Sequence, residues 1–276
     1  MKKLEKGEVI GRGRTADVIY WGYNKVLKLF NKEISLELID YQYKVDCIIG
    51  KIFSNCPKAF EKIEKDDRRG IVYEYIEGVP LRESMGRSIK KVGKGMKILA
   101  ETHAEMHKHE ITDILTQYEF FSMAINKTEL LNDDQKRKII DYLKKLPDGN
   151  TICHGDMHPE NLLVSKDKSY VMDWSNTYSG NPNSDVARTI YVLKYGLAAT
   201  DEVTLKKSFL HKFFFKVIKK LAARPYIKQY LKLTGRSLKE IEKWNLVIFA
   251  ARLCEPVPLE YDNLLEMIEN KLNHLK

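Results

Sequence analysis

Apolar residues in the first part of the chain recur with two different periods. Short runs rich in β-branched and aromatic residues predict strands at residues 9–10, 16–21, 25–30 and 71–76. From about residue 35 to residue 53 the apolar spacing is helical. Strands with one long helix inserted predict a small α+β unit, which we expect to span residues 1–78.

Beyond this unit, over residues 79–276, the pattern becomes mainly helical. Two helices are predicted at about residues 96–109 and 133–146, and the last third of the chain also has helical spacing. Ser237 and Glu240 form a capping-box pattern, which predicts the start of a helix that carries Trp244. The helical part is interrupted by short strand candidates at residues 151–153, 161–164 and 170–173.

Composition places the chain among globular proteins. Of its 276 residues, 43% are hydrophobic and 31% are charged. The four cysteines are scattered, without a CxxC pair, so we expect free thiols rather than a zinc ribbon or disulfides. No stretch approaches the ~20 apolar residues of a membrane span, and the N-terminus leads into no apolar signal segment. We therefore expect a cytoplasmic protein without a membrane partner.

The net charge of +9 has three readings: a nucleic-acid partner, an anionic substrate such as a nucleotide, or a lysine-rich surface. The lysines are spread along the chain, which favours the last reading, so no nucleic-acid partner is expected. The densest basic segment, Lys206–Lys220, is amphipathic. A surface helix docked by its apolar face is favoured there over a helix that lies on a membrane.

The most informative segment is the run His-Gly-Asp-Met-His-Pro-Glu-Asn, from His154 to Asn161. About a dozen residues later, Asp173 ends an apolar strand candidate. The run resembles the H-G-D-x-x-x-x-N catalytic loop of aminoglycoside phosphotransferases, choline kinases and their relatives, and Asp173 is similar to their magnesium-binding aspartate. The resemblance implies a bilobal protein-kinase-like α+β fold, with a small β-rich N-lobe and a larger, mainly helical C-lobe.

Phosphoryl transfer explains why these residue types are needed. It requires an aligned acceptor hydroxyl and neutralised charge on the phosphate oxygens. By the resemblance, Asp156 accepts the hydrogen bond and the proton of the hydroxyl, while Asn161 and Asp173 hold Mg²⁺. His154 is expected to brace the loop. His158 is either catalytic or part of the loop scaffold, and we favour scaffold.

Further matches extend the resemblance towards the N-terminus. Gly11, Gly13 and Thr15 lie in a glycine-containing loop between two strand candidates, where the family's phosphate-covering loop lies, and Val18 is expected to pack on the adenine. Lys28, between apolar neighbours on its strand face, is expected to bind the α- and β-phosphates. The backbone carbonyl of Glu74 and the amide of Ile76 are expected to bond the adenine edge.

One family feature is altered. A glutamate on the following helix should pair with Lys28, but the expected place is near Gln42, which has no charge to offer. Glu37 is the other candidate, and the sequence does not decide between them.

Three other features have both a functional and a structural reading. Asp185, in a G-x-P-x-x-D pattern, is expected to cap a helix and to bond the catalytic loop. His103 and His107, at i and i+4, could bind zinc, but helices with histidines here pack behind the catalytic loop in the resembling families, and we favour packing. An acidic C-terminal cluster could hold a polycationic substrate, although an ordinary solvated helix face is favoured; it comprises Glu255, Glu260, Asp262, Glu266 and Glu269.

The sequence therefore predicts a small-molecule kinase that transfers the γ-phosphate of ATP or GTP, with Mg²⁺, to a hydroxyl group. A protein kinase is disfavoured because the span from Asp173 to Asp185 is too short for an activation segment. A non-catalytic pseudokinase is disfavoured because Lys28, Asp156, Asn161 and Asp173 are all intact. The acceptor stays open among aminoglycosides, choline or ethanolamine, and sugars.

Overall fold

The computed structural model describes residues 4–86, 88–166, 168–196 and 209–275, without the side chains of residues 209–216. These residues form two compact units. The first contains Met1–Ser84 and Glu160–Ser175, and the second contains Met85–Pro159 and Asn176–Lys276. The sequence patterns suggested one boundary, at residue 78. The structure adds the later segment to the first unit because its strands pair with a strand just after that boundary.

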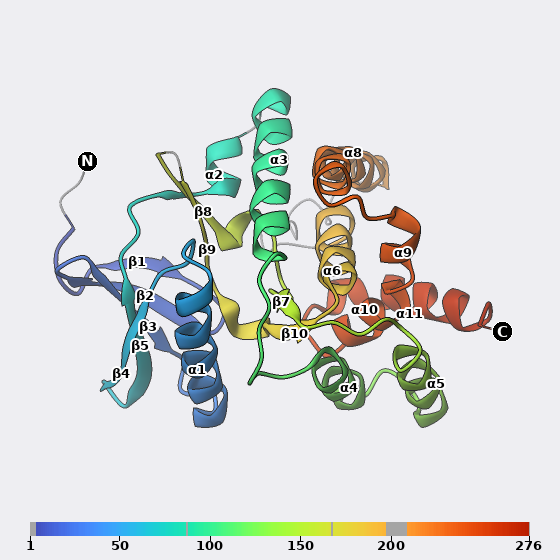
Figure 1. Ribbon diagram of the computed structural model, residues 1–276, viewed down its shortest axis with the longest axis horizontal. Helices are drawn as coiled ribbons and strands as arrows, with labels where there is room; N and C mark the ends of the chain where they lie inside the picture. Colours follow the sequence, from blue (N-terminus) through green and yellow to red (C-terminus); the bar gives the residue numbers. More distant parts are fainter. Residues whose placement is uncertain (1–3, 87, 167, 197–208, 276) are drawn as a thin grey trace. The chain divides into compact units, whose positions relative to one another are not determined.

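The first unit is built on an antiparallel sheet of five strands in the order β1-β2-β3-β5-β4 (Figure 1). The strands are β1 (Val9–Arg12), β2 (Ala16–Gly22), β3 (Lys25–Phe30), β4 (Ala59–Lys65) and β5 (Arg68–Glu74). The strand predictions are confirmed for β1, β2, β3 and β5. Strand β4 was missed, because four of its seven residues are glutamate or lysine and it lies at a half-exposed edge of the sheet.

Helix α1 (Leu36–Ile52) covers one face of this sheet (Figure 1). Ser35 caps its first turn by accepting a hydrogen bond from Leu38 N at 3.4 Å. Ile39 of the helix packs with Phe30 of β3 in one core cluster. Leu27 of the same strand packs on the opposite face of the sheet. The predicted alternation along β3 is thereby confirmed, and Lys28 shares the face with Phe30.

A second, three-stranded sheet in the order β6-β8-β9 completes the first unit. It contains β6 (Val79–Pro80), β8 (Leu162–Ser165) and β9 (Lys168–Val171), with the short helices α2 (Leu81–Met85), η1 (Pro159–Asn161) and η2 (Trp174–Asn176) beside its strands. Val171 N donates to Asn55 O at 2.8 Å, and the ring of Trp174 meets Phe53 edge to face. These contacts tie the hairpin to the segment that follows α1.

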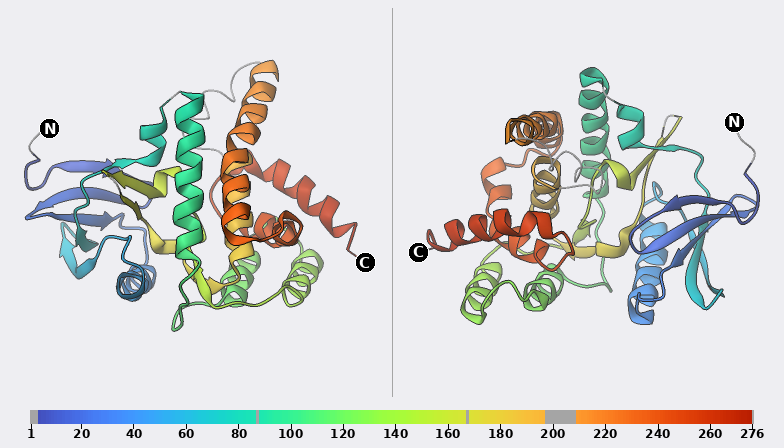
Figure 2. Two further views of the ribbon diagram at one scale, coloured as in Figure 1. Left: turned by 45° about the horizontal axis from the view of Figure 1, so that its top comes forward. Right: turned by 180° about the vertical axis from the view of Figure 1, so that it is seen from behind.

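The second unit is mainly helical. Its helices are α3 (Ile89–Met106), α4 (Gln117–Lys127), α5 (Asp133–Leu143), α6 (Pro182–Lys194), α8 (Phe209–Thr234), α9 (Leu238–Glu242), α10 (Asn245–Arg252) and α11 (Pro258–Leu272). Strands β7 (Thr151–Cys153) and β10 (Tyr178–Gly180) pair antiparallel. Helices α3 and α8 lie side by side (Figures 1 and 2). The mixed α+β fold, with a β-rich N-terminal part and a helical C-terminal part, is as predicted.

The helix predicted to start at Ser237 is two helices instead. Ser237 precedes α9 but makes no side-chain capping bond, and α9 ends before Trp244. Trp244 is fully buried and its ring lies 6.1 Å from that of Phe121 on α4. Seating this large side chain coincides with the break, after which α10 begins.

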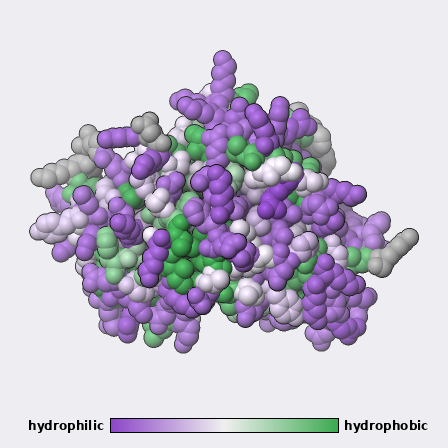
Figure 3. All heavy atoms as spheres, viewed as in Figure 1, coloured by the Kyte–Doolittle hydropathy of each residue, from purple (hydrophilic) through white to green (hydrophobic). Residues whose placement is uncertain are grey.

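The visible surface in Figure 3 is mostly hydrophilic. Within the described ranges, no helix combines the length and apolar character needed to cross a membrane. Of the basic segment Lys206–Lys220, residues 206–208 and the side chains up to Lys216 lie outside the described residues.

Candidate active site

Lys28 lies at the centre of the first unit's sheet. On the neighbouring strands it is opposite Val18 and Ile71, so these three residues form a row across one face. The Lys28 side chain is only 15% exposed, and its ammonium lies 5.2 Å from the Phe30 ring. A lysine held this way among apolar groups needs an anionic partner.

The structure brings Lys28 and Asp173 together, although they are 145 residues apart in the chain. The ammonium Nζ donates to Asp173 Oδ1 at 2.8 Å, and the aspartate side chain stays 42% exposed. Asp173 has a positive φ of 59°, a left-handed conformation that aspartate tolerates better than most residues. Such conformations concentrate at functional sites, where the surrounding structure holds them in place.

Gln42, rather than Glu37, is the α1 residue next to Lys28. Lys28 Nζ donates to Gln42 Oε1 at 3.4 Å, and Gln42 is buried. Glu37 lies in the first turn of α1 and is exposed. The neutral amide accepts a hydrogen bond from the lysine but does not balance its charge.

Asn161 lies beside the segment that leads to Asp173. Met172 N donates to Asn161 O at 2.9 Å, at the end of the hairpin where β8 begins and β9 ends. The carboxylate of Asp173, which is partly open to solvent, and the amide of Asn161, which directly precedes β8, offer hard oxygen donors, which suit Mg²⁺. The donor set of this hairpin therefore fits the metal that the sequence implied.

The glycine-containing loop joins β1 to β2, with Gly11 opposite Val18 in the register. Gly13 N donates to Ala16 O at 2.8 Å, and Thr15 O accepts from Asn31 N at 2.8 Å. In this conformation the Gly13 amide closes the hairpin itself. For the Gly13 amide to bind a phosphate, as predicted, the backbone at the loop tip must change conformation and break this hydrogen bond.

The hinge candidates lie at the end of β5. Glu74 is the last residue of the strand, and Tyr75 N donates to Asn24 O at 2.8 Å. Ile76 follows in a segment without regular structure. The roles of the Glu74 carbonyl and the Ile76 amide in binding adenine stay predictions.

In the second unit, Asp156 lies in the loop after β7 and is bound on both oxygens. Oδ1 accepts from Arg188 Nη2 at 3.2 Å, and Oδ2 lies 3.3 Å from His158 Nε2. Burial alone would raise the pKa of Asp156. The hydrogen bond from His158 and the positive charge of Arg188 outweigh burial and hold that pKa well below its usual range. Asp156 is therefore a carboxylate at neutral pH.

The backbone of this loop is held by Asp185. Asp185 Oδ2 accepts from His154 N at 2.6 Å, and Oδ1 accepts from Gly155 N at 2.9 Å. His154 Nδ1 in turn accepts from Asp156 N at 3.2 Å, which is the brace expected of it. The capping role predicted for Asp185 is wrong: Asn181 is the N-cap of α6, and Asp185 lies in its first turn.

Gly155 is required at its position by the backbone. Its φ is +75°, and a Cβ built there would lie 2.1 Å from the carbonyl oxygen of Asn176. No other residue fits without moving the chain. The loop is thereby fixed from Cys153, in β7, to Asp156.

Comparison with known proteins decides the family. The model of the phosphotransferase enzyme family APH matches residues 6–204, well over half of the chain. This chain belongs to that family. A curated relative, a protein LicA homolog from Mycoplasma capricolum, is 26% identical over 162 residues. The match covers 58% of this chain and 60% of that relative, so it spans less than two thirds of the relative's own length.

Solved structures show that the chain has a kinase-like fold. Aminoglycoside phosphotransferase APH(4)-Ia superposes with a TM-score of 0.64 at 12% identity, covering 98% of this chain and 93% of the other. An ethanolamine kinase from Plasmodium vivax superposes with a TM-score of 0.55 at 14% identity, covering 97% and 82%. The family resemblance predicted from the sequence is confirmed.

Three residues around the candidate site were missed by the sequence analysis, and two of them lie behind Lys28. Tyr73 donates a short hydrogen bond to Asp46 Oδ2 and accepts one from Gln42 Nε2 at 3.4 Å. Asp46 is 3% exposed, and burial raises its pKa to about 7, although the Tyr73 hydroxyl and the Lys28 charge act in the opposite direction. Asp46 follows Gln42 by one helical turn, and this spacing could have identified it.

The third missed residue is Arg188, which connects Asp156 to the C-terminal acids. Its Nη2 also donates to Glu255 Oε1 at 2.5 Å, and Arg252 pairs with both Glu255 and Glu260. Arg252 reaches the two oxygens of buried Glu260 at 2.8 and 2.9 Å. The prediction of an ordinary solvated face is therefore wrong for Glu255 and Glu260. Their charges are already balanced by arginines. Asp262, Glu266 and Glu269 are exposed as predicted.

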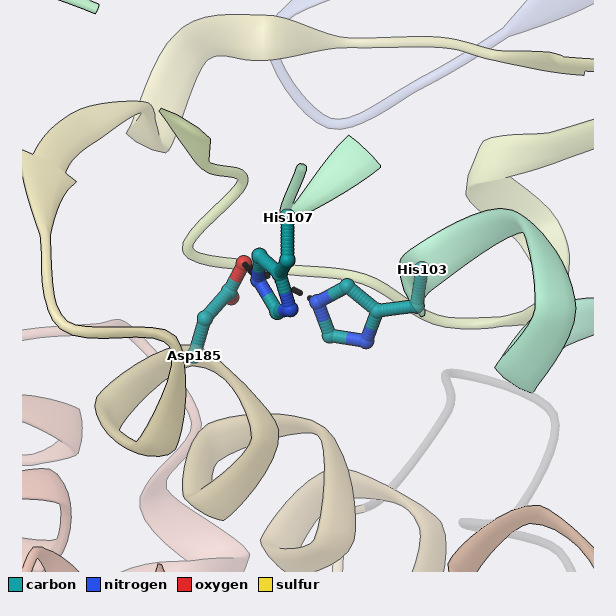
Figure 4. Close-up of side chains that lie close together, drawn as sticks. All are labelled: His103, His107 and Asp185. Carbon is teal, nitrogen blue, oxygen red and sulfur yellow. Dashed lines mark hydrogen bonds and ion pairs between the residues drawn. The ribbon is translucent and has the colours of Figure 1, made fainter. Parts of the chain in front are cut away.

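The two histidines of α3 point into the same region. His103 and His107 both contact Asp185, at 3.0 and 3.2 Å from its Oδ2 (Figure 4). The helix packs behind the catalytic loop, as the family resemblance implied.

Proposed function

We propose that the protein is a small-molecule kinase that transfers the γ-phosphate of ATP or GTP to a hydroxyl of its substrate. One observation carries this proposal. Lys28 belongs to the predicted phosphate-binding motif and Asp173 to the predicted metal-binding motif. The ammonium of Lys28 and the carboxylate of Asp173 lie 2.8 Å apart. A nucleotide with its bound Mg²⁺ needs both charges at one place.

The residues of the first unit are proposed to hold the donor. Lys28 would bind the α- and β-phosphates, replacing the partner that it has in Asp173. Asp173 and Asn161 would hold Mg²⁺, which neutralises charge on the phosphate oxygens when it is bound. The β1–β2 loop would cover the phosphates. Two aminoglycoside phosphotransferases of similar fold, one in complex with ADP and one with AMP-PNP, support a nucleotide donor.

Asp156 of the second unit is proposed to act on the acceptor. Because His158 and Arg188 keep its pKa low, its carboxylate is a weak base. It would accept a hydrogen bond from the hydroxyl and orient the attacking oxygen, and it would take the proton only as the new O–P bond forms. This assigns Asp156 to alignment and charge more than to early proton removal.

The acceptor is proposed to be a small molecule. Between Asp173 and Asp185 the described chain contains only the short helix η2, strand β10 and the first turn of α6. That leaves no segment on which a peptide could be laid out. Aminoglycosides, choline or ethanolamine, and sugars are the acceptor classes to compare. Because one of the similar structures is an ethanolamine kinase, amino alcohols are the first acceptors to test.

Turnover tests the proposal directly. The purified protein is given Mg·ATP or Mg·GTP with each acceptor in turn, and nucleoside diphosphate and phosphorylated product are both measured. Asp156→Asn should keep the fold and the nucleotide affinity while transfer falls by at least ~10²-fold, the usual scale for a positioned acid or base. The matched control is Asp141→Asn, which removes a carboxylate from an exposed pair with Lys144. Asp141→Asn should turn over normally.

Two results would overturn the proposal. If Asp156→Asn transfers phosphate as fast as the wild type, Asp156 is not the residue that aligns the acceptor. If the protein binds Mg·nucleotide but phosphorylates no acceptor in any class, it is a nucleotide-binding pseudokinase.

A further inference from the structure

Five buried side chains from three helices meet behind the catalytic loop. His103 comes from α3 and His107 is the C-cap of that helix, Asp185 comes from α6, and Tyr226 and Tyr230 come from α8. Figure 4 shows both imidazoles directed at the Asp185 carboxylate. His103 Nδ1 lies 2.7 Å from the Tyr226 hydroxyl, and His107 Nδ1 lies 2.8 Å from the Tyr230 hydroxyl. Each imidazole is therefore held between a carboxylate and a tyrosine.

The charge of Asp185 decides where the protons are. Burial would raise its pKa, but His103 and His107, which face the carboxylate and hydrogen-bond to it, hold that pKa well below the usual range. An ionised carboxylate only accepts hydrogen bonds, so the Nε2 atoms of His103 and His107 must both carry protons. Burial and the neighbouring His103 lower the pKa of His107 to about 4, so His107 is neutral at pH 7.

A neutral imidazole with a proton on Nε2 has a bare Nδ1. The Tyr230 hydroxyl therefore donates to His107, and the same arrangement satisfies His103 and Tyr226. If a hydroxyl is removed, its imidazole loses the partner that favours this tautomer. The imidazole can then present its unprotonated nitrogen to Asp185, and the hydrogen bond between them is lost.

A bound cation is the competing explanation. One ligand atom from each of His103, His107 and Asp185 lies within 4.8 Å of the others, the spacing of a possible metal site. However, Asp185 Oδ2 already accepts from His154 N at 2.6 Å, and all four ring nitrogens have hydrogen-bond partners between 2.7 and 3.2 Å. Protons alone satisfy every polar atom of these rings.

We propose that Tyr226 and Tyr230 are positioning residues for phosphoryl transfer. Their hydroxyls fix the tautomers of the two histidines. The histidines hold Asp185 in place, and Asp185 holds the His154 and Gly155 amides directly before Asp156. The kinetic part of this proposal rests on the proposed function. Two tyrosines of helix α8 thereby set the geometry of a loop that precedes them by some 70 residues.

The direct test is the protonation of the rings. In wild-type protein with ¹⁵N-labelled histidine, both rings should give the nitrogen shifts of the Nε2–H tautomer at pH 7. Tyr226→Phe should move only His103 towards a mixture of tautomers, and Tyr230→Phe only His107. An Nδ1–H tautomer in either wild-type ring would overturn the proposal. The proposal would also be overturned if the purified protein retained one equivalent of zinc bound to the Nε2 atoms of His103 and His107.

The second readout is the loop itself. In the double variant, hydrogen exchange of the His154 and Gly155 amides should accelerate about tenfold, the scale of one weakened buried hydrogen bond. With the acceptor found in the panel, kcat should fall about tenfold while the nucleotide KM changes less than about twofold. Unchanged exchange in the double variant would overturn the proposal. So would a kcat equal to that of the wild type.

The control is Tyr142→Phe, which removes a hydroxyl that donates to Lys243 O at 2.9 Å, away from the loop. It should leave ring tautomers, loop exchange and kcat unchanged. An equal effect of Tyr142→Phe would assign the changes to general destabilisation and refute a positioning role. The tautomer and exchange measurements need no substrate, so they distinguish failure of this proposal from failure of the proposed function.

Discussion

Replacing Asp46 by asparagine should stabilise the protein at alkaline pH. The Asp46 carboxyl is 3% exposed and accepts a hydrogen bond from Tyr73. Burial raises its pKa from the ordinary 3.8 to about 7, despite the opposing Tyr73 hydrogen bond and Lys28 charge. An acid with a raised pKa binds its proton more tightly in the native state than in the unfolded state. Its ionisation therefore destabilises the fold as pH rises from about 4 to about 7.

The size of the effect follows from that pKa. A tenfold change in proton affinity corresponds to ~1.4 kcal/mol, so a rise from 3.8 to about 7 costs the native state ~4 kcal/mol once Asp46 is ionised. Of this, ~3 kcal/mol is lost between pH 5 and pH 8. Asparagine cannot ionise, and its amide oxygen can still accept from Tyr73. Asp46→Asn should therefore gain ~3 kcal/mol over the wild type between pH 5 and pH 8.

Urea unfolding at pH 5 and pH 8, followed by the fluorescence of Trp21 and Trp174 in the first unit, measures this difference. A ¹³C titration of the Asp46 carboxyl gives the pKa directly and should show a midpoint near 7. Asp40→Asn is the control, because Asp40 is an exposed residue of the same helix that pairs with Lys62. The stability of Asp40→Asn should change between pH 5 and pH 8 as that of the wild type does. Parallel stability curves for Asp46→Asn and wild type, or a carboxyl midpoint below about 5, would refute the reasoning.

Two further predictions concern the loop and the metal. Gly155→Ala should destabilise the protein by at least ~2 kcal/mol in urea unfolding, because φ is +75° and the new Cβ would meet the Asn176 carbonyl. Gly93→Ala, in open space within α3, should be neutral or stabilising, and equal losses for both variants would contradict this explanation. Asp173→Ala should weaken nucleotide binding at least ~10-fold in calorimetry with Mg²⁺ but much less without it. Equal affinities of this variant and the wild type with Mg²⁺ would count against the metal role.

The sequence reveals those parts of the site that depend on short-range pattern. The period-two alternation placed Lys28 on the same face as Phe30, and the spacing of a turn and two strands placed Asp173 at the end of β9. The bounds of helix α1 were likewise predicted nearly to the residue. In each case neighbouring residues carry the signal, since backbone periodicity and turn chemistry are local.

What the sequence did not reveal depends on contacts between distant segments. Asp46 reads as one polar residue in an amphipathic helix, and only Tyr73, on a strand 27 residues away, gives it a buried partner. Arg188 follows a recognised motif, yet its function is defined by Glu255, 67 residues later. Charged residues are usually exposed, so a sequence does not mark the few that a fold buries in pairs.

The first compact unit is discontinuous in the chain, and this has a consequence for its synthesis. Residues 1–84 emerge from the ribosome well before Glu160–Ser175, the segment that supplies β8 to β6 and Asp173 to Lys28. Until then β6 lacks its partner strand β8, and Lys28 lacks the carboxylate of Asp173 with which it pairs. Completion of the first unit must wait for about 90 further residues, a long-range closure of the kind that slows folding. A fragment that ends at Ser84 is therefore an incomplete folding unit, not a domain.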